Sequence, residues 1–395
     1  MRILDVGPWI AYPPERGRAV RTYSLLLALS ASHDVRQFGR APHGLSRREP
    51  LFEEVPVTPM FRVVRCRYPF GSAVVDWLVR QDRRGTLREL VARQIACPKR
   101  FGELLRWASV IVAEDPVELA LCRQEWPHGR YAFVAHDVGQ LDAVSRSGHD
   151  RLAEAVASAA LTIAVSPSDR EELMARYALS PERVAVVPNG ADPERLRPLE
   201  RDAKEQVRRE LDLPPGPVVL FAGSNSPQNL VGLAWIRRLA KATDRFAFVV
   251  IGSVAKSERS GRLVVRGSVG DVAPYFQAAD LALCPIEHGS GTRMKLWASL
   301  AAGLPTVAFA ESLRGTGLEP GRQLIVADKS ERAILSALER LAHDPDLSRR
   351  LASAGRDFVV EHRSWQRSSE LMASALERLL ESGEPDLPAS GIAAA

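Results

Sequence analysis

The chain has 395 residues, of which 46% are hydrophobic and 26% are charged, and its formal net charge is +5. This length exceeds what one hydrophobic core usually supports, so two domains are expected. The composition is that of an ordinary soluble protein, and no apolar run is long enough to span a bilayer. The small net charge gives no reason to expect nucleic acid as a partner.

Short apolar runs rich in β-branched residues alternate with longer helical patterns along the chain. The first half is predicted to hold strands at Arg2–Val6, Val110–Ala113, Tyr131–Ala135, Leu161–Val165 and Arg183–Val187. The second half is predicted to hold strands at Val218–Ala222, Phe246–Ile251, Leu263–Arg266, Leu281–Cys284, Thr306–Phe309 and Gln323–Val326. Strands that alternate with helices form βαβ units with parallel sheets, so we expect an α/β protein with two doubly wound, Rossmann-like domains.

The boundary between the two domains is predicted near Pro198, after the polar and proline-rich stretch Pro188–Pro198. Residues 1–198 then form the N-terminal domain and residues 199–364 the C-terminal domain. The tail at 383–395 shows no periodicity, so we expect it to be disordered.

Cysteine usage and the N-terminus indicate a cytoplasmic protein. The four cysteines, Cys66, Cys97, Cys122 and Cys284, are widely spaced and form no CxxC pair, which argues against a zinc site or a disulfide framework. The segment MRILDVGPWI resembles a first strand rather than a signal peptide.

A basic segment extends from Phe61 to Val110 and holds eleven Lys or Arg residues against four Asp or Glu residues. Aromatic and aliphatic residues are interleaved with these charges, chiefly over residues 62–106. One interpretation is a set of amphipathic helices with solvated basic faces. The other is a surface for an anionic acceptor or for lipid headgroups, which would place the protein at the inner face of a membrane.

Loops that follow predicted strands are candidate sites, because ligands of doubly wound sheets bind at the carboxyl ends of the strands. Gly17 and Arg18 stand near the start of a helix after the first strand, where glycine allows backbone amides to approach an oxyanion. A plain helix N-cap is the alternative. His136 ends an apolar strand, where it is either structural or able to bind a sugar hydroxyl or a phosphate. Gly223, Ser224 and Asn225 suit a phosphate-facing loop or a generic turn.

The strongest pattern is PIEHGSGTRMKLWASLAAGLP, which starts at Pro285. It contains Gly289, Ser290, Gly291 and Thr292, followed by Arg293 and Lys295 in the first turn of a predicted helix. Cations at a helix N-terminus oppose the helix dipole, so their placement is better explained by an anion bound among them. Gly303 and Pro305 are predicted to end this helix.

Metal chemistry is not indicated. No Asp-x-Asp follows a predicted strand, and the Asp344–Asp346 pair lies in a turn between helices, where an N-cap is the simpler interpretation. Walker, GxSxG and HExxH motifs are absent from the sequence.

These segments, in this order, resemble the family-4 retaining glycosyltransferases with the GT-B fold. PNGAD at Pro188–Asp192 is similar to the family's Pro-Asn-Gly-x-Asp segment, and VVLFAGSNSPQN is similar to the opening of its donor domain. The stretch from Val264 to Ala308 looks like the core of the donor site. The likeness covers the chain from Met1 to about Leu380 and is weakest over residues 40–105.

The resemblance implies two Rossmann-like domains facing across a cleft that closes on binding. The C-terminal domain would hold a nucleotide-diphosphate sugar as co-substrate, with Ser268 and Val269 by the nucleobase and Gly289–Lys295 by the diphosphate. The N-terminal domain would bind a sugar, lipid-linked or small-molecule acceptor near Gly17, and a final helix at about 365–382 would pack back onto it. No cofactor or essential metal is implied, and transfer would retain anomeric configuration.

The same resemblance predicts a glycosyl transferase in which Arg293 and Lys295 stabilise the leaving diphosphate and His136 contacts the transferred sugar or the reacting phosphate. Two family glutamates are replaced here by Ser290 and Ala298, and the loop after Gly223 lacks the family's cations. These departures keep two alternatives open: a non-catalytic GT-B partner or scaffold, and a sugar-nucleotide epimerase or hydrolase on the same fold.

Overall fold

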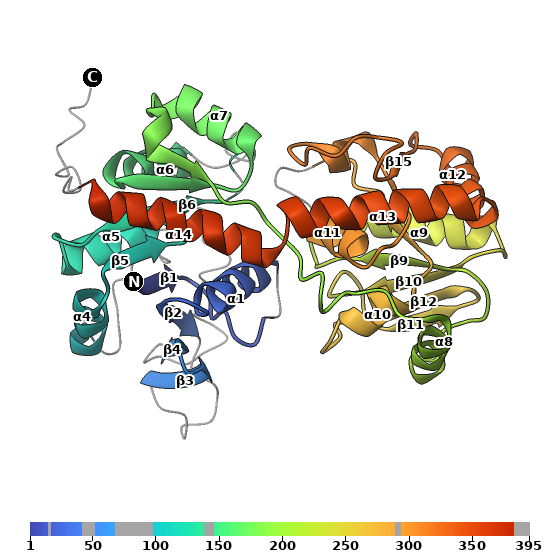
Figure 1. Ribbon diagram of the computed structural model, residues 1–395, viewed down its shortest axis with the longest axis horizontal. Coiled ribbons are helices and arrows are strands. Elements are labelled where there is room, and N and C mark those ends of the chain that lie inside the picture. The colour runs from blue at the N-terminus through green and yellow to red at the C-terminus, as the bar shows by residue number, and fades with distance from the viewer. Residues whose placement is uncertain are drawn as a thin grey trace. The chain divides into compact units, whose positions relative to one another are not determined.

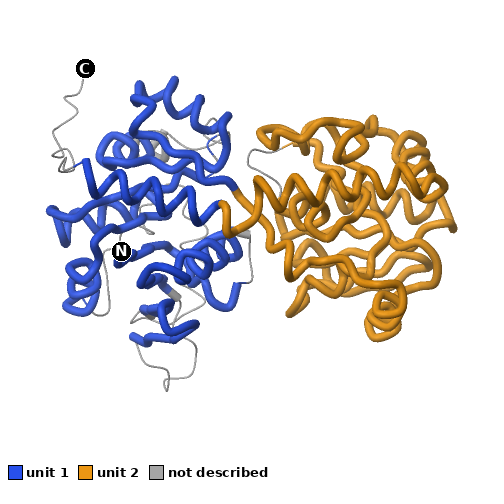
Figure 2. Tube along the Cα trace, in the orientation of Figure 1, with its two compact units in different colours: residues 1–188, 368–395 blue, residues 189–367 orange. Residues whose placement is uncertain are grey.

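The computed structural model of the protein describes residues 1–14, 17–41, 52–67, 98–136, 138, 146–288 and 294–382. The chain divides into two compact units, Met1–Pro188 with Ser368–Ala395 and Asn189–Arg367 (Figure 2). Each unit contains one mainly parallel sheet flanked by helices, which confirms the predicted α/β class with two doubly wound halves (Figure 1). The expected boundary residue Pro198 lies within the second unit.

The sheet of unit 1 has eight strands in the order β3-β4-β2-β1-β5-β6-β7-β8. Their bounds are β1 (Arg2–Gly7), β2 (Asp34–Ala41), β3 (Phe52–Thr58), β4 (Phe61–Arg67), β5 (Val110–Ala113), β6 (Tyr131–Ala135), β7 (Leu161–Ala164) and β8 (Val184–Val186). Among these strands β3 and β4 pair antiparallel, and the other neighbours pair parallel. Strand order reverses between β1 and β5, which is a topological switch point.

Three strands of unit 1, β2, β3 and β4, were not predicted, because charged residues interrupt their apolar pattern. Arg36 of β2 lies over the Trp107 ring, with its guanidinium carbon 4.1 Å from the ring centroid. Arg40 of the same strand pairs with the buried Glu118. Partners that lie far away in the sequence therefore make these arginines compatible with a strand. Part of the basic segment therefore forms the strand β4. One of the two interpretations had predicted amphipathic helices for this segment.

Unit 1 contains several helices, and two of them begin at side-chain caps. The helices are α1 (Gly17–Leu29), α4 (Pro98–Trp107), α5 (Pro116–Glu125), α6 (Arg146–Ser158), α7 (Pro167–Tyr177), the 3-10 turn η2 (Pro181–Arg183) and α14 (Trp365–Glu381). Asp115 caps α5 and Ser166 caps α7, each followed by proline at the first helical position. The apolar face of α14, with Met372, Leu376 and Leu379, joins the core that contains Ile3 of β1.

The sheet of unit 2 has seven strands in the order β11-β12-β10-β9-β13-β14-β15. Their bounds are β9 (Val218–Ala222), β10 (Ala247–Ile251), β11 (Glu258–Ser260), β12 (Leu263–Gly267), β13 (Leu281–Cys284), β14 (Thr306–Ala308) and β15 (Ile325–Val326). The short antiparallel edge strand β11 was not predicted, and all three of its residues are exposed. The switch point of this sheet lies between β9 and β13.

The helices of unit 2 are α8 (Arg201–Glu210), α9 (Pro227–Ala242), α10 (Ala273–Ala278), α11 (Met294–Ala301), the 3-10 turn η3 (Ala310–Leu313), α12 (Glu331–His343) and α13 (Pro345–His362). Trp297 of α11 is fully buried and stacks on Phe358 of α13. Gly303, with a φ of +64°, ends α11 as predicted, and the amide of Leu304 donates to the carbonyl of Ser299. This tight stop turns the chain directly into β14.

Candidate functional site

Three titratable residues meet at the carboxyl edge of the unit 1 sheet. Asp5 lies near the end of β1, Glu114 directly follows β5, and His136 directly follows β6. The three strands are parallel neighbours, so their carboxyl ends share one edge of the sheet. This edge lies at the switch point, where doubly wound sheets bind ligands.

The predicted site residue His136 is held by Glu114. Nε2 of the imidazole contacts Oε2 of the carboxylate at a very short distance, and the two side chains keep only 10% and 4% of their exposure. The ring also lies against Trp9 in an edge-on arrangement, with centroids 6.0 Å apart. His136 is thus fixed from two sides before any ligand binds.

Beneath this pair, Asp5 and Arg21 complete a buried charge network. Burial, followed by the charge of Glu114, raises the pKa of Asp5 well above its ordinary value. Burial also favours a raised pKa for Glu114, but the charge and hydrogen bond of His136, with contributions from Asp5 and Arg21, lower it to about 2. Burial therefore favours the protonated form of Asp5, and the contact with His136 favours the ionised form of Glu114.

The loop after β1 is anchored on β2. The Gln37 side chain accepts from the amide of Ala11 at 3.2 Å and donates to the carbonyl of Trp9 at 3.0 Å. Gly39 is required there, because a Cβ at this position would lie 2.2 Å from the carbonyl oxygen of Trp9. Trp9 in turn lies under the guanidinium of Arg18, at 5.7 Å from the ring centroid.

Gly17 is the first residue of α1, and Arg18 follows it. This is where the sequence predicted a helix start after the first strand. The proposed role of the two residues beside an acceptor stays a prediction.

In unit 2, two glycine turns close against each other at the carboxyl edge of the sheet. Gly252 follows β10 with a φ of +98°, and a Cβ on it would lie 2.2 Å from the carbonyl oxygen of Gly223, which follows β9. The amide of Gly223 donates to the carbonyl of Ile251 at 2.9 Å, and the amide of Asn225 donates to Oγ of Ser253 at 3.1 Å. Two amides of the predicted phosphate-facing loop are therefore already used within the fold.

Asn229, in the first turn of α9, ties this loop to Lys295. Its side-chain nitrogen donates to the carbonyl of Ser224 at 2.8 Å, and its side-chain oxygen accepts from the Lys295 ammonium. The ammonium also lies 5.1 Å from the centroid of the Phe221 ring. The structure thus brings the predicted residues Ser224 and Lys295 together through a residue that the sequence analysis did not single out.

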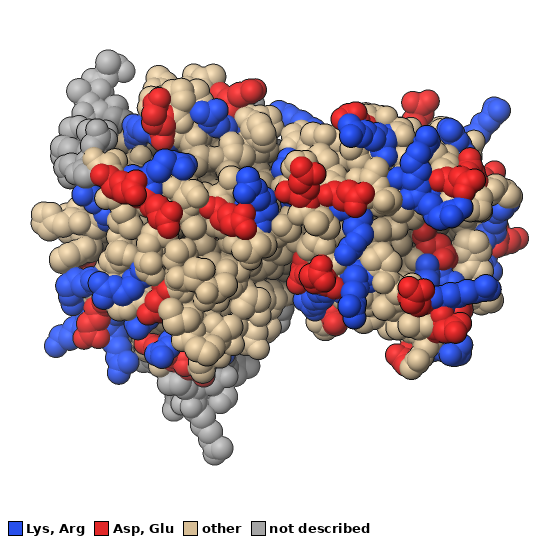
Figure 3. All heavy atoms as spheres, in the orientation of Figure 1, with Lys and Arg blue, Asp and Glu red and all other residues tan. Residues whose placement is uncertain are grey.

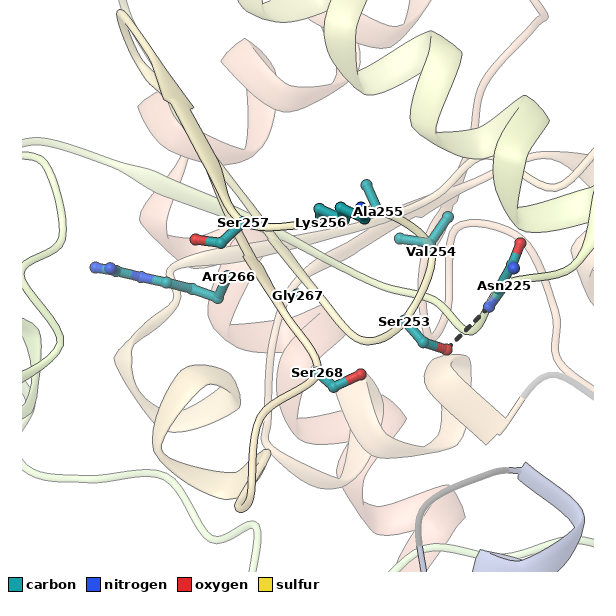
Figure 4. Close-up of a pocket in the computed structure, with 9 residues that line it drawn as sticks. All are labelled: Asn225, Ser253, Val254, Ala255, Lys256, Ser257, Arg266, Gly267 and Ser268. Atoms are coloured by element: carbon teal, nitrogen blue, oxygen red, sulfur yellow. Dashed lines mark hydrogen bonds between the residues drawn. The ribbon is translucent and has the colours of Figure 1, made fainter. Parts of the chain in front are cut away.

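A pocket of about 550 Å³ adjoins the same edge of unit 2. Asn225 after β9, residues 253–257 after β10 and Arg266–Ser268 at the end of β12 line it (Figure 4). Figure 4 shows Asn225 bonded to Ser253, while the Arg266 side chain points away from both. Arg266 donates to the backbone carbonyls of Leu211 and Asp212. The pocket lining therefore combines small polar groups and main chain with the aliphatic Val254 and Ala255 and the cationic Lys256, and it includes the predicted residue Ser268.

Several other predicted residues fall outside this pocket or outside the described residues. Val269 is partly buried and packs against the core of unit 2. The described part of α11 begins at Met294. Five predicted residues lie in the turn that is not among the described residues: Gly289, Ser290, Gly291, Thr292 and Arg293.

Ala298, which replaces an expected glutamate, is partly buried and packs on the same core. The nearest acidic residue in the sequence, Glu287, is engaged elsewhere: it accepts a hydrogen bond from Nε1 of Trp235 at 2.6 Å. Arg238 covers that indole ring at 3.7 Å. Glu287 is thus held in a cluster with Trp235 and Arg238 of α9.

The described part of the basic segment is partly neutralised. Arg62 lies 3.8 Å from Glu54 and Arg65 lies 3.6 Å from Glu53, each across the β3–β4 pair. Figure 3 shows Lys and Arg mixed with Asp and Glu on the visible face of each unit. Along the described portion of the chain, no helix is long and apolar enough to cross a membrane.

Within the described ranges, no three His, Cys, Asp or Glu side chains gather as they would around a metal ion. Asp344 caps α13 through a bond from the amide of Leu347 at 2.9 Å, as predicted. That the reaction needs no metal or cofactor stays a prediction.

Glu114, Asp5 and Asn229 are the residues that sequence reasoning missed. Glu114 had a usable signal, because an acidic residue directly after the apolar run Val110–Ala113 stands at a strand end. Asp5 gave no signal of its own, because it lies inside the apolar run that predicts the first strand. Asn229 looks like an ordinary residue in the first turn of a helix.

Two family models match the chain. One described as "Glycosyltransferase Family 4" covers residues 16–195, and one described as "Glycosyl transferases group 1" covers residues 216–344. The first match lies mainly in unit 1, and the second lies within unit 2 and includes the switch point between β9 and β13.

Among curated relatives, a D-inositol 3-phosphate glycosyltransferase of Streptomyces bingchenggensis is 28% identical over 244 residues, which is 55% of this chain. The match spans 52% of that relative's length, which is about half of it.

Among solved structures, a sucrose-phosphate synthase from Thermosynechococcus elongatus aligns with a TM-score of 0.73 at 17% identity, over 97% of this chain and 100% of that one. The Anabaena protein HepE, in complex with UDP and glucose, aligns with a TM-score of 0.72 at 13% identity, over 96% and 100%. At these identities the alignments establish the fold, which is GT-B.

Proposed function

Because this chain belongs to the family-4-like glycosyltransferases of the GT-B fold, we propose that it transfers a sugar from a nucleotide-diphosphate sugar to an acceptor hydroxyl. Transfer proceeds with retention of configuration and without a metal ion. The product belongs to a glycan, a glycolipid or a natural product.

The observation that carries this proposal is the carboxyl edge of unit 2. There two glycine turns close on each other, the Lys295 ammonium is held beside Ser224 by Asn229, and a pocket of about 550 Å³ adjoins them. This volume lies within the range of small-molecule sites. Small polar groups with one positioned cation suit a nucleoside diphosphate, with the nucleobase near Ser268 and the diphosphate near Lys295.

In this proposal Lys295, together with Arg293, stabilises charge on the leaving diphosphate. Such charge stabilisation is the main contribution that a protein makes to transfer of this kind without a metal. Unit 1 binds the acceptor, beside Gly17 and Arg18, and His136 contacts a substrate sugar or phosphate. The basic segment at residues 62–106, part of which lies outside the described residues, is a candidate contact with lipid headgroups if the acceptor is membrane-bound.

Thermal unfolding in the presence of UDP, GDP, dTDP and ADP tests the donor site. A nucleotide that binds only the native state at 100 times its Kd stabilises the protein by about 2.7 kcal/mol. One nucleotide of the four is expected to raise the Tm, and Lys295→Met should abolish that shift. Lys241→Met, at the exposed far end of α9, is the matched control and should keep it.

A second function, a non-catalytic partner protein, is favoured by one observation: Ala298 packs on the core where the family usually has a ribose-binding carboxylate. A flat response to all four nucleotides would support that alternative and reject the transferase proposal. Binding of one nucleotide, followed by turnover only when an acceptor is present, would support transfer over epimerisation or hydrolysis.

A further inference from the structure

The pocket of unit 2 is lined by two cationic side chains that differ in their bonds. Arg266 donates to the backbone carbonyls of Leu211 and Asp212, and Figure 4 shows its side chain pointing away from Ser253. Lys256 is exposed and forms no hydrogen bond or ion pair with any residue that the structure describes. Its ammonium group is therefore the cation of this pocket that can serve a ligand.

Lys256 lies on a fixed stretch of the pocket wall. On one side of it, the amide of Val254 donates to the carbonyl of Gly223 at 3.1 Å. On the other side, the hydroxyl of Ser257 donates to the carbonyl of Val265 at 3.2 Å. Because the chain is held on both sides, a ligand has to order only the Lys256 side chain, which limits the entropy cost of binding.

The same stretch lies beside Ser268. Gly267 has a φ of +70°, and a Cβ on it would lie 4.0 Å from the carbonyl carbon of Lys256. Ser268 follows directly, and the proposed function places the nucleobase there. Lys295, which the proposed function assigns to the diphosphate, is instead held by Asn229 of α9. The two lysines thus serve different parts of the nucleotide.

The pocket offers hydrogen-bond donors more readily than acceptors. Its lining, all of it within the described residues, contains no Asp or Glu side chain, and an ammonium group only donates. The hydroxyl of Ser253 already accepts from the amide of Asn225, which leaves its hydrogen to donate. The carbonyl of Gly267 already accepts from the amide of Gly252 at 2.7 Å. A ligand edge that carries acceptors therefore fits this pocket best.

Nucleobases differ in the exocyclic group that such a pocket would meet. Guanine presents O6, while uracil and thymine present O4, and these oxygens accept hydrogen bonds. Adenine and cytosine present an amine at the corresponding position, and an amine donates. The donors of the pocket therefore distinguish the two groups of bases.

We propose that Lys256 is a specificity-determining residue that donates to the exocyclic carbonyl oxygen of the nucleobase, so that the site takes uracil, thymine or guanine in preference to adenine or cytosine. An amine at that position would leave two donors facing each other without an acceptor, which weakens binding. The inference rests on the proposed function for the presence of a nucleotide in the pocket.

Calorimetry of the full-length protein with two matched pairs of nucleotides tests the inference. UDP and CDP form one pair, inosine diphosphate (IDP) and ADP form the other, and each pair exchanges an exocyclic oxygen for an amine. We expect the tightest ligand of the four to be UDP or IDP, and to bind about tenfold more tightly than its amine partner. Equal affinities within that pair, or tighter binding of CDP or ADP, would overturn the inference and leave the transferase proposal standing.

Lys256→Met then assigns the preference to this side chain. Because Lys256 makes no bond within the described residues, the variant should keep the Tm of the free protein. The two members of the pair should become equal in affinity, through weaker binding of UDP or IDP. An equal loss for both members would show that the ammonium attracts the diphosphate, and an unchanged preference would show that other groups select the base. Either result would overturn the inference.

Lys241→Met is the matched control. It removes another exposed lysine of the same unit, at the far end of α9, and should keep both the affinity and the preference of the wild type. An equal change in the two variants would point to overall charge and count against Lys256. If none of the four nucleotides binds the wild type, the donor in the proposed function is wrong and the inference falls with it.

Discussion

The two sheets end at their switch points with different chemistry. At the ends of β1 and β5 in unit 1, the edge is made of titratable side chains that are mostly buried: Asp5, Arg21, Glu114 and His136. Beyond β9 and β10 of unit 2, it is made of main chain, where Gly223 and Gly252 leave no room for a side chain. The first edge holds the His136 ring in place, and the second brings two stretches of backbone close together.

This difference shows that the same doubly wound sheet topology can support two chemically different edges. A charged edge costs desolvation free energy, which its internal pairing must offset. A glycine edge costs conformational entropy in the unfolded chain and has little electrostatic cost. Substitutions should therefore damage the two edges in different ways, through steric strain in unit 2 and through unpaired charge in unit 1.

The largest effect is expected at Gly252. Gly252→Ala combines a strained φ of +98° with a Cβ 2.2 Å from the carbonyl oxygen of Gly223, and should cost about 4 kcal/mol of unfolding free energy. Urea denaturation measures this loss.

Gly261→Ala is the matched control for Gly252→Ala. Gly261 has a φ of +57°, and a Cβ added to it would meet no atom within 4 Å, so only the strain of about 1 kcal/mol applies. Equal losses for the two variants would mean that the close approach of the two turns is not important.

Arg21 is the residue whose loss should damage the charged edge most. Arg21→Met leaves the Glu114 carboxylate buried without its compensating guanidinium, so a loss of about 3 kcal/mol is expected in urea denaturation. It also removes a bond from Arg21 to the carbonyl of Val187 at 2.9 Å.

Arg170→Met separates these two contributions. Arg170 likewise donates to backbone carbonyls, those of Val184 and Pro181, but lies outside the carboxylate network. Its substitution should cost only about 1 kcal/mol. A loss at Arg21 no larger than this would show that the charges at the edge of unit 1 are not balanced as described.

Glycine positions and strand ends are easier to predict than charge networks. The apolar runs at Val218–Ala222 and Tyr131–Ala135 identify buried parallel strands, because both faces of such strands are covered. His136 could be predicted as a site residue from its place after such a run. Its contact with Glu114 could not, because the two residues are 22 positions apart and their meeting depends on the strand order.

The missed strands of unit 1 have the same origin. Arg36, Gln37 and Arg40 lie in β2, where a local pattern argues against a buried strand. Their partners are Trp107, the Trp9 loop and Glu118, which no local pattern could identify. Sequence reasoning therefore recovers elements that local apolar pattern defines and misses those that long-range pairing stabilises.

A milder change at the carboxyl edge of unit 2 is possible at the contact between Asn229 and Lys295. Asn229→Asp replaces the acceptor of the Lys295 ammonium by a carboxylate, so the cation is partly neutralised, and it also removes the donor to the carbonyl of Ser224. We expect affinity for the nucleotide identified by thermal unfolding to fall about tenfold, near 1.4 kcal/mol, in calorimetry.

The neighbouring Gln228→Glu places the same charge on the adjacent residue of α9 and serves as the matched control. It should weaken nucleotide binding much less. Similar losses in the two variants would point to a general charge effect and not to Lys295.

The smallest effect is expected for Asp5→Asn, and its dependence on pH carries the information. Because the folded-state pKa of Asp5 is raised, its contribution to wild-type stability is present at acid pH and is lost as pH rises through that value. Near pH 4 the wild type and Asp5→Asn should differ by less than about 1 kcal/mol, since the side chain at position 5 is then uncharged in both folded proteins. With rising pH the free energy of unfolding of the variant should increase relative to that of the wild type.

Glu114, whose pKa is lowered to about 2, changes stability only at more acid pH than Asp5 does. Urea denaturation from pH 4 to 8, with Asp34→Asn at the opposite end of the sheet as control, measures the trend. A wild type that gains on the variant as pH rises would mean that Asp5 is ionised in the folded protein, and the charged edge of unit 1 would then need a second cation.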